Sequence, residues 1–209
     1  MALSKIQPAS MDLTANYAFT GTNSISSASS GAYEEKKLAT LTASSSSTLS
    51  FTSSIDNTYN IYKFRFINIH GSEDRKNFLI NFRDGSSNFD ATKTTSFFQA
   101  SHKEDDSEAQ MSYNTSGDLA QSTSAANLDR FVGNDADQHI CGELFLFDPS
   151  STTFVKHFIA RSITIEGNNA AQDAFLAGYC NVTAAIDGVQ FSMSSGNIDS
   201  GTIEMYGIN

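Results

Sequence analysis

The chain has 209 residues, of which 39% are hydrophobic and 17% charged, and its net charge is −10 at pH 7. A chain of this length and apolar content can fill one large core, which excludes disorder along its whole length. The acidic balance excludes a duplex nucleic acid as a partner, because phosphate binding needs clustered Lys and Arg and the sequence holds no basic stripe.

Residues 1–31 carry no consistent hydrophobic period and end in a Ser- and Gly-rich run, GTNSISSASSG. Apolar anchors stand among small polar residues in this segment: Leu3, Ile6, Leu13, Tyr17 and Phe19. Such a segment cannot bury its apolar side chains alone, so we expect an extended docking arm that orders only against its own domain or a neighbouring subunit. Exchange of arms between subunits adds buried area at low cost, which predicts a homo-oligomer, with a trimer favoured.

The N-terminus lacks the apolar core of a secretory signal, and no stretch of the sequence approaches the length of a membrane span. Neither export by the usual route nor a membrane partner is therefore expected. These features predict a protein that is made in a cytoplasm and does not leave it by the usual secretory route.

Residues 32–209 predict a single all-β domain of about ten strands. Alternating apolar stretches recur between short turns: KKLATLTA, STLSFTS, YNIYKFRFINI, NFLINFR, TSFFQAS, AQMSYNT, GELFLF, TTFVKHFIARSITIE, DAFLAGYCNV, IDGVQFSMS and TIEMYGI. The only helical element expected is one turn around Ser124 to Phe131. An antiparallel jelly-roll-like β-sandwich fits best, because two Greek keys supply eight strands and leave room for edge additions.

The long stretch YNIYKFRFINI places Tyr62, Phe64 and Phe66 on one face of a strand. Three isoleucines are expected on its other face: Ile61, Ile67 and Ile69. Apolar residues on both faces predict a central strand that is covered on both sides.

The last two stretches, within residues 186–209, are joined by a polar loop with a glycine and predict a closing hairpin. The core is expected to contain seven large side chains: Phe51, Phe64, Phe66, Phe82, Phe145, Phe191 and Ile203.

The sequence contains no G-x-S-x-G, H-E-x-x-H, P-loop or G-x-G-x-x-G motif, so neither an enzymatic activity nor a cofactor is predicted. The best candidate for a cation site is GNDADQH, where Asp135, Asp137 and His139 alternate and would share one face of a strand. A solvated acidic loop is the alternative interpretation, and it is also the one we give to the acidic run at residues 104–108.

Cys141 and Cys180 stand in apolar, strand-like stretches without a C-x-x-C pair, which favours two buried free thiols. A disulfide between them stays open, because it requires Cα atoms within about 7 Å. Sugar binding is also open, since the jelly-roll architecture includes lectin domains. The chain has no Trp, so the candidates for stacking on a sugar are loop or edge tyrosines: Tyr33, Tyr59 and Tyr113.

Three stretches resemble the small virion proteins of marine and cyanobacterial tailed bacteriophages. They are the N-terminal MALSKIQPASMDLTANYAFTGTNS, the central TLTASSSSTLSFTSSIDNTYNIYKFRFINIH and the C-terminal AIDGVQFSMSSGNIDSGTIEMYGI. The resemblance implies a jelly-roll domain in a virion, with phage capsid or tail proteins as partners and no catalytic residues. A capsid decoration or cement protein that docks through its arm is the first expectation. A tail fibre or tail-tip protein that recognises a host glycan is the alternative.

Overall fold

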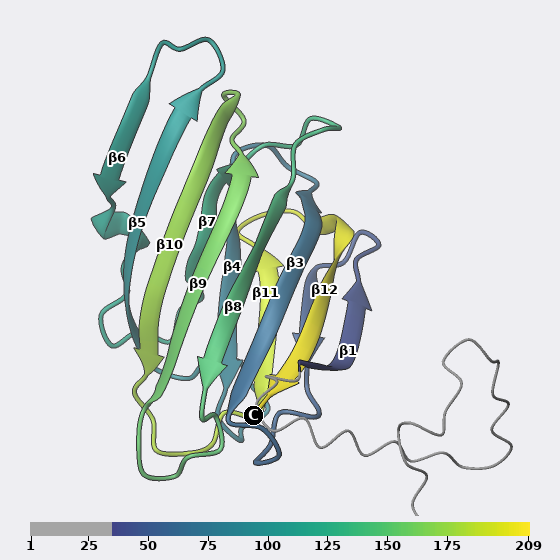
Figure 1. Cartoon of the computed structure of the whole chain (residues 1–209), viewed down its shortest axis with the longest axis vertical. Coiled ribbons are helices and arrows are strands. Elements are labelled where there is room, and N and C mark those ends of the chain that lie inside the picture. The colour runs from purple at the N-terminus through teal and green to yellow at the C-terminus, as the bar shows by residue number, and fades with distance from the viewer. Residues whose placement is uncertain (1–34) are drawn as a thin grey trace, which may run out of the picture. The chain divides into compact units, whose positions relative to one another are not determined.

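Two antiparallel β-sheets make up residues 35–209, the part of the chain that the computed structural model describes (Figure 1). The all-β class is confirmed, and the one helical element in this part is a 3-10 turn, Thr115–Gly117. No helix among these residues is long and apolar enough to span a membrane.

The larger sheet has eight strands in the order β1-β12-β3-β8-β9-β10-β5-β6. Their bounds are β1 Lys36–Thr42, β12 Ile198–Ile208, β3 Ile61–Gly71, β8 Ile140–Phe147, β9 Lys156–Ile165, β10 Ala170–Cys180, β5 Lys93–Lys103 and β6 Ala109–Tyr113. The smaller sheet has four strands in the order β2-β11-β4-β7. Their bounds are β2 Thr48–Phe51, β11 Gly188–Met193, β4 Lys76–Arg83 and β7 Ala126–Val132.

The strand pairing is that of a jelly roll. Four antiparallel pairs are nested along the chain: β1 with β12, β2 with β11, β3 with β8, and β4 with β7. This nesting results when one long antiparallel ribbon rolls up into two facing sheets, so the predicted jelly-roll sandwich is confirmed. Residues 35–209 form twelve strands, where about ten were expected.

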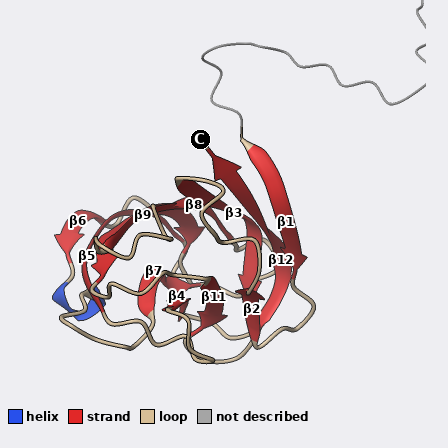
Figure 2. Cartoon of the chain, turned by 90° about the horizontal axis from the view of Figure 1, so that it is seen from below, coloured by secondary structure: helices blue, strands red, loops and turns tan. Residues whose placement is uncertain are grey.

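Four additional strands, which we call the extension, widen the larger sheet beyond the jelly roll. The β5–β6 hairpin is inserted between β4 and β7, and the β9–β10 hairpin between β8 and β11. β9 pairs with β8, and β10 joins β9 to β5, so two insertions far apart in sequence form one continuous addition. Figure 2 shows the larger sheet arching over the smaller one, with the extension at one end.

The core between the sheets is aromatic and centres on Phe191. Its ring lies 5.4 to 6.3 Å, between centroids, from four other rings: Phe51, Phe64, Phe66 and Phe78. Burial of each such side chain contributes about 1.5–3 kcal/mol. Six of the seven predicted core residues are buried. Phe145 is the wrong one, because Leu144 and Leu146 take the inward positions of β8 and leave Phe145 on the opposite face.

A β-bulge in β3 places Ile69 on the core face, so the prediction that Ile69 lies on the other face of the strand is wrong. Asn68 has a φ of 51°, and the register against β8 shifts between Phe66 and Ile69. The extra residue turns Ile69 into the core, where it is fully buried. Opposite the bulge, Gly201 has a φ of 108°, and a Cβ atom there would lie 2.4 Å from the Asn68 carbonyl oxygen. Ile67 is 37% exposed, so within residues 35–209 the expectation that β3 is covered on both faces is wrong.

Two expected elements are absent from the described residues. The segment expected to form a helical turn, around Ser124 to Phe131, is instead strand β7, which pairs with β4. A spacing of four residues places Leu128 and Val132 on one face of a helix and of a strand alike, and both are buried in the core. The closing hairpin is also wrong, because β11 pairs with β2 and β4 while β12 pairs with β1 and β3. Residues 194–197 cross from one sheet to the other instead of forming a hairpin turn.

Candidate functional site

Exposed apolar side chains gather on one surface of the described residues. Within residues 35–209, seven large hydrophobic side chains are exposed. Six of them lie on the face of the larger sheet that points away from the smaller sheet: Ile67, Phe98, Met111, Tyr113, Ile159 and Ile163. We call this surface the outer face; Figure 1 looks onto it. The seventh, Phe154, lies in the loop between β8 and β9. Apolar clustering on one face marks a candidate interaction surface.

The strand register aligns the outward side chains into rows that cross the whole sheet. One row, which we call the central row, runs from β6 to β12: Tyr113, Phe98, Phe175, Arg161, Glu143, Arg65 and Glu204. Its extension end is aromatic, and its jelly-roll end alternates between basic and acidic groups. Next to it, Ile159, Phe145 and Lys63 form the middle of a second row.

The aromatic end of the central row is tightly packed. The rings of Phe98 and Phe175 stack with centroids 4.6 Å apart at an angle of 6°, and the Arg161 guanidinium lies 5.0 Å from the Phe175 centroid. Arg161 donates two hydrogen bonds to Asp173, at 2.9 and 2.6 Å, and this contact raises the pKa of Arg161. Neighbours from β5 and β9 thus cover Phe175. Beside these rings is a hollow of about 340 Å³, lined also by Phe145 and Ile159.

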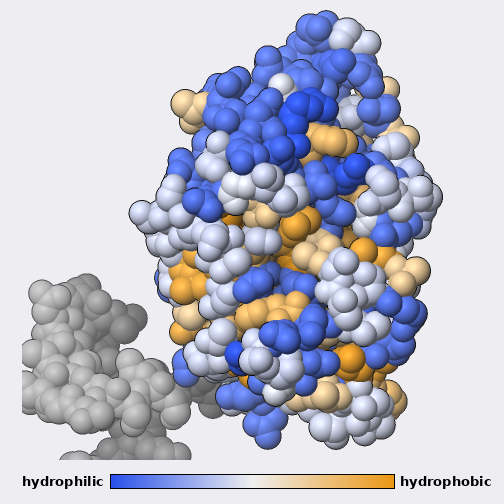
Figure 3. All heavy atoms as spheres, turned by 180° about the vertical axis from the view of Figure 1, so that it is seen from behind, coloured by the Kyte–Doolittle hydropathy of each residue, from blue (hydrophilic) through white to orange (hydrophobic). Residues whose placement is uncertain are grey.

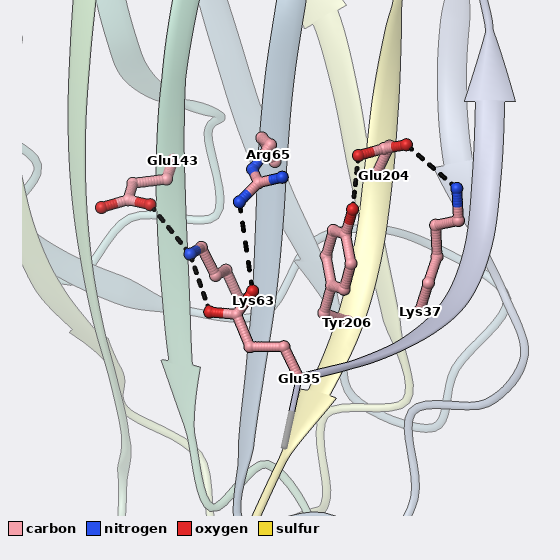
Figure 4. Close-up of polar contacts among 7 residues, drawn as sticks. All are labelled: Glu35, Lys37, Lys63, Arg65, Glu143, Glu204 and Tyr206. Atoms are coloured by element: carbon pink, nitrogen blue, oxygen red, sulfur yellow. Dashed lines mark hydrogen bonds and ion pairs between the residues drawn. The ribbon is translucent and has the colours of Figure 1, made fainter. Parts of the chain in front are cut away.

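The basic residue Lys63 lies almost buried in the outer face, between two carboxylates (Figure 4). Its Nζ lies 3.0 Å from Glu35 Oε1 and 3.2 Å from Glu143 Oε2, and 5.3 Å from the centre of the Phe145 ring. Burial acts to lower the pKa of Lys63, but the hydrogen bonds to Glu35 and Glu143 outweigh it and raise that pKa. Lys63 therefore stays charged and connects the acidic groups of this face to its aromatic part.

A second group of paired charges lies over β1 and β12. Lys37 Nζ is 3.2 Å from Glu204 Oε1, and the Tyr206 hydroxyl donates to the other oxygen of Glu204 (Figure 4). These contacts, with that of Tyr206 the larger, lower the pKa of Glu204. The ion pairs of the outer face join four basic and four acidic side chains: Lys37, Lys63, Arg65 and Arg161 with Glu35, Glu143, Asp173 and Glu204. The charges of this set cancel, although the whole chain carries −10.

The predicted cation site has a different geometry from the one expected. Asp135, Asp137 and His139 lie in the turn between β7 and β8, not on a strand. The Asp135 carbonyl accepts a hydrogen bond from Gln138 N–H, and His139 Nδ1 lies 3.1 Å from the Asp137 carbonyl, so backbone contacts shape the turn. Among residues 35–209, no group of three or more His, Cys, Asp or Glu is arranged to hold a metal ion. The interpretation from strand alternation is therefore wrong.

Both cysteines are free thiols, as the sequence favoured. Cys180 is buried, whereas Cys141 is only half-buried, on the outer face beside Ile163. Lys93 and Lys156 flank Cys180 as its cross-strand neighbours. Burial raises the pKa of Cys180 to about 12 despite the two lysines, so this thiol is not poised as a nucleophile.

Among residues 35–209, the carboxyl group with the largest stated pKa shift is that of Asp129 in β7, which lies between the sheets under the extension. Its Oδ1 accepts hydrogen bonds from Gln172 Nε2 and from the Arg130 backbone N–H, while Oδ2 has no hydrogen-bond partner among residues 35–209. Complete burial raises its pKa to about 7. A shifted pKa is a common mark of a functional carboxyl group. Asp129 does not line the hollow beside Phe98 and Phe175, so we assign it to the packing between the sheets.

Two of the three tyrosines proposed to stack on a sugar lie in the described part of the chain. Tyr113 is 61% exposed and donates a hydrogen bond to Asp118, whereas Tyr59 packs edge-on against Tyr62. Tyr33 and the five arm residues lie outside the described residues: Leu3, Ile6, Leu13, Tyr17 and Phe19.

Sequence reasoning missed the outer face, although the consecutive apolar residues of TSFFQAS and GELFLF carried its signal. Comparison with protein-family models, with characterised proteins and with solved structures finds no match. The outer face is therefore interpreted from its own geometry: aromatic edges, exposed isoleucines and paired charges on a broad sheet. Such a surface is suited to burying area against another macromolecule.

Proposed function

We propose that the chain is a non-enzymatic structural protein of a bacteriophage particle, first of all a capsid decoration or cement protein. A protein of this kind acts by burying area on neighbouring subunits, so it needs a broad surface with exposed apolar groups more than it needs a deep cleft. The outer face, with six of the seven large hydrophobic side chains that are exposed within residues 35–209, is the observation that supports this proposal. The resemblance to phage virion proteins supports it independently.

The paired charges of the outer face also favour a structural role. Ion pairs at a protein surface contribute little to stability, with a median of about 0–1 kcal/mol each. The stability of the fold therefore does not explain why five ion pairs lie on this one face. At an interface, however, such charges set the register and reject wrong partners. A particle component must bind one neighbour in one orientation, which this arrangement can specify.

Counting the chain in purified particles tests the proposal. For a decoration protein, quantitative mass spectrometry should give a copy number comparable to that of the major capsid protein, and a reconstruction should show its density on the capsid surface. A tail protein would be present in far fewer copies. Absence of the chain from washed, infectious particles would refute both roles.

A tail-tip protein that binds a host glycan is the second candidate, and the exposure of Tyr113 favours it. This ring lies on the edge strand β6 next to Phe98, with its hydroxyl 2.6 Å from Asp118 Oδ2. A glycan array with the purified chain tests this role. Tyr113→Ala should abolish a true signal, whereas Phe154→Ala, which removes an exposed aromatic ring away from the outer face, should preserve it.

A further inference from the structure

We propose that the outer face docks against the same face of a second copy of this chain, in a two-fold dimer whose larger sheets stack with aligned strands. This inference deepens the proposed function by naming one partner of the chain. It rests on the proposed function, because both require the outer face to be a surface for assembly. Four properties of the outer face support it.

The first property is the contrast between the two sides of the sandwich. The outward side chains of the smaller sheet are mostly amides and hydroxyls, and they bond to one another across strands, as in Gln190 with Ser50 and Asn77 with Asn127. Figure 3 views this side and shows hydrophilic and intermediate residues with hydrophobic ones between them. The larger sheet instead exposes Phe98, Ile159 and Ile163 by 40%, 48% and 56%. One side is suited to water, and the other is suited to a partner surface.

The second property is electrical neutrality. Two copies of a chain with a net charge of −10 repel each other, and the repulsion is weakest where the facing surfaces carry no net charge. The four basic and four acidic groups of the outer face cancel, so this face allows a copy to approach. A strongly charged partner would gain nothing from such a surface, which favours a second copy over a basic protein.

The third property is the alternation along the central row. A two-fold axis that runs along the strands between β3 and β8 places Arg65 opposite the partner's Glu143. The same axis places Arg161 opposite the partner's Glu204, because β9 then lies over β12 of the second copy. In the second row, Ile159 comes opposite the partner's Tyr206. Each of these opposite-charge pairs thus occurs twice, as an interface between identical faces requires.

The fourth property is the size of the face. With the axis between β3 and β8, the six strands from β1 to β10 lie over their counterparts, while β5 and β6 extend beyond the overlap. Six strands about 4.8 Å apart span about 24 Å, and the four outward positions of β9 span about 20–25 Å along the strands. The product, roughly 500–600 Å² per copy or about 1,000–1,200 Å² in total, lies at the low end of specific interfaces and predicts a dimer of modest affinity. Aligned stacking of two sheets is also a standard way in which β-structures pack.

The proposal is tested by measuring the molecular mass of the purified full chain, by sedimentation and light scattering, at protein concentrations of about 1–200 µM. The wild-type chain should be in a concentration-dependent equilibrium between monomer and dimer. Ile159→Asp should weaken the dimer by about tenfold or more, because it places a charge in the apolar centre of the interface. Phe154→Asp is the matched control, since it puts the same charge at an exposed apolar residue away from the face, and it should leave the dimer unchanged. Both variants should melt like the wild-type monomer, because both side chains are exposed.

A charge exchange gives an independent test of the register. Arg65→Glu alone should weaken the dimer by about tenfold, and adding Glu143→Arg should restore the affinity to within about threefold, because the opposed pair is rebuilt with reversed signs.

A monomer at every concentration overturns the proposal, as does a dimer that Ile159→Asp leaves intact. Hydroxyl-radical footprinting that finds Phe145 and Ile159 shielded in a monomer also overturns it, since another part of the same chain would then cover the face. If the chain is monomeric yet present in particles, the dimer alone fails; if it is dimeric yet absent from particles, the proposed function alone fails.

Discussion

The substitution Asp129→Asn should remove a large pH dependence from the stability of the protein. Asp129 is completely buried, and its folded-state pKa of about 7 lies well above its ordinary value of 3.8. The Asp129 carboxyl group therefore loses its proton near pH 4 in the unfolded chain and only near pH 7 in the folded chain. The contribution of Asp129 to stability is fully present below pH 4 and is lost as the pH rises through 7.

The magnitude follows from the width of that pH window. Each pKa unit corresponds to about 1.4 kcal/mol, and the interval from pH 5 to the folded-state pKa of about 7 covers about two units. Between pH 5 and pH 8.5, Asp129 should thus lower the free energy of unfolding by about 3 kcal/mol. An asparagine retains an oxygen that can accept the hydrogen bonds from Gln172 and Arg130, and it does not ionise.

Urea unfolding at pH 5 and at pH 8.5, for the wild-type chain and the Asp129→Asn variant, measures this effect. The wild-type chain should lose about 3 kcal/mol more than the variant between the two pH values. Asp135→Asn, in an exposed turn, is the control and should behave like the wild type. Burial also raises the pKa of Glu166, so some pH dependence in the same direction should persist in both variants. Equal losses in the wild-type chain and in Asp129→Asn would refute the reasoning.

Three other predictions concern the core, the thiols and the loop at residues 133–139. Phe66→Ala should cost about 3–5 kcal/mol in a thermal or urea unfolding experiment, whereas Phe145→Ala, on the outer face, should cost about 1 kcal/mol or less; equal costs would contradict the assignment of faces. A thiol reagent should modify Cys141 in the folded chain and Cys180 only after unfolding, and a non-reducing gel should show no internal crosslink. EDTA should leave the melting temperature unchanged, and a shift that Ca²⁺ reverses would restore the cation site of that loop.

Alternation along the sequence predicted most strands because their inward residues are bulky and regular. In β4, for example, Phe78, Ile80 and Phe82 all face the core. β7 escaped prediction because its buried positions include Asp129, a residue that sequence reasoning places outside. That carboxyl is buried between the sheets, where Gln172, from an insertion more than 40 residues away, donates a hydrogen bond to it.

The outer face was hidden for a different reason. In β8, both faces are apolar, with Leu144 and Leu146 on one and Phe145 and Phe147 on the other, so alternation does not say which pair is inside. In β3, the bulge at Asn68 reverses the alternation, and it is recognised only together with Gly201 on the neighbouring strand. Pairings between distant strands decide both cases, and a single sequence does not reveal them.

The nested pairing of the strands also determines the order in which the protein folds. Lys37 of β1 and its partner Glu204 of β12 are 167 residues apart, so a large entropy of loop closure opposes that pair, whereas the β5–β6 and β9–β10 hairpins close over a few residues. The hairpins should form in microseconds, and the complete sheet should follow in milliseconds to seconds. Until β12 enters between β1 and β3, both of those strands present a bare edge that another chain can pair with. Refolding yield should therefore fall steeply with protein concentration, and the cell that makes this protein should need chaperones during that interval.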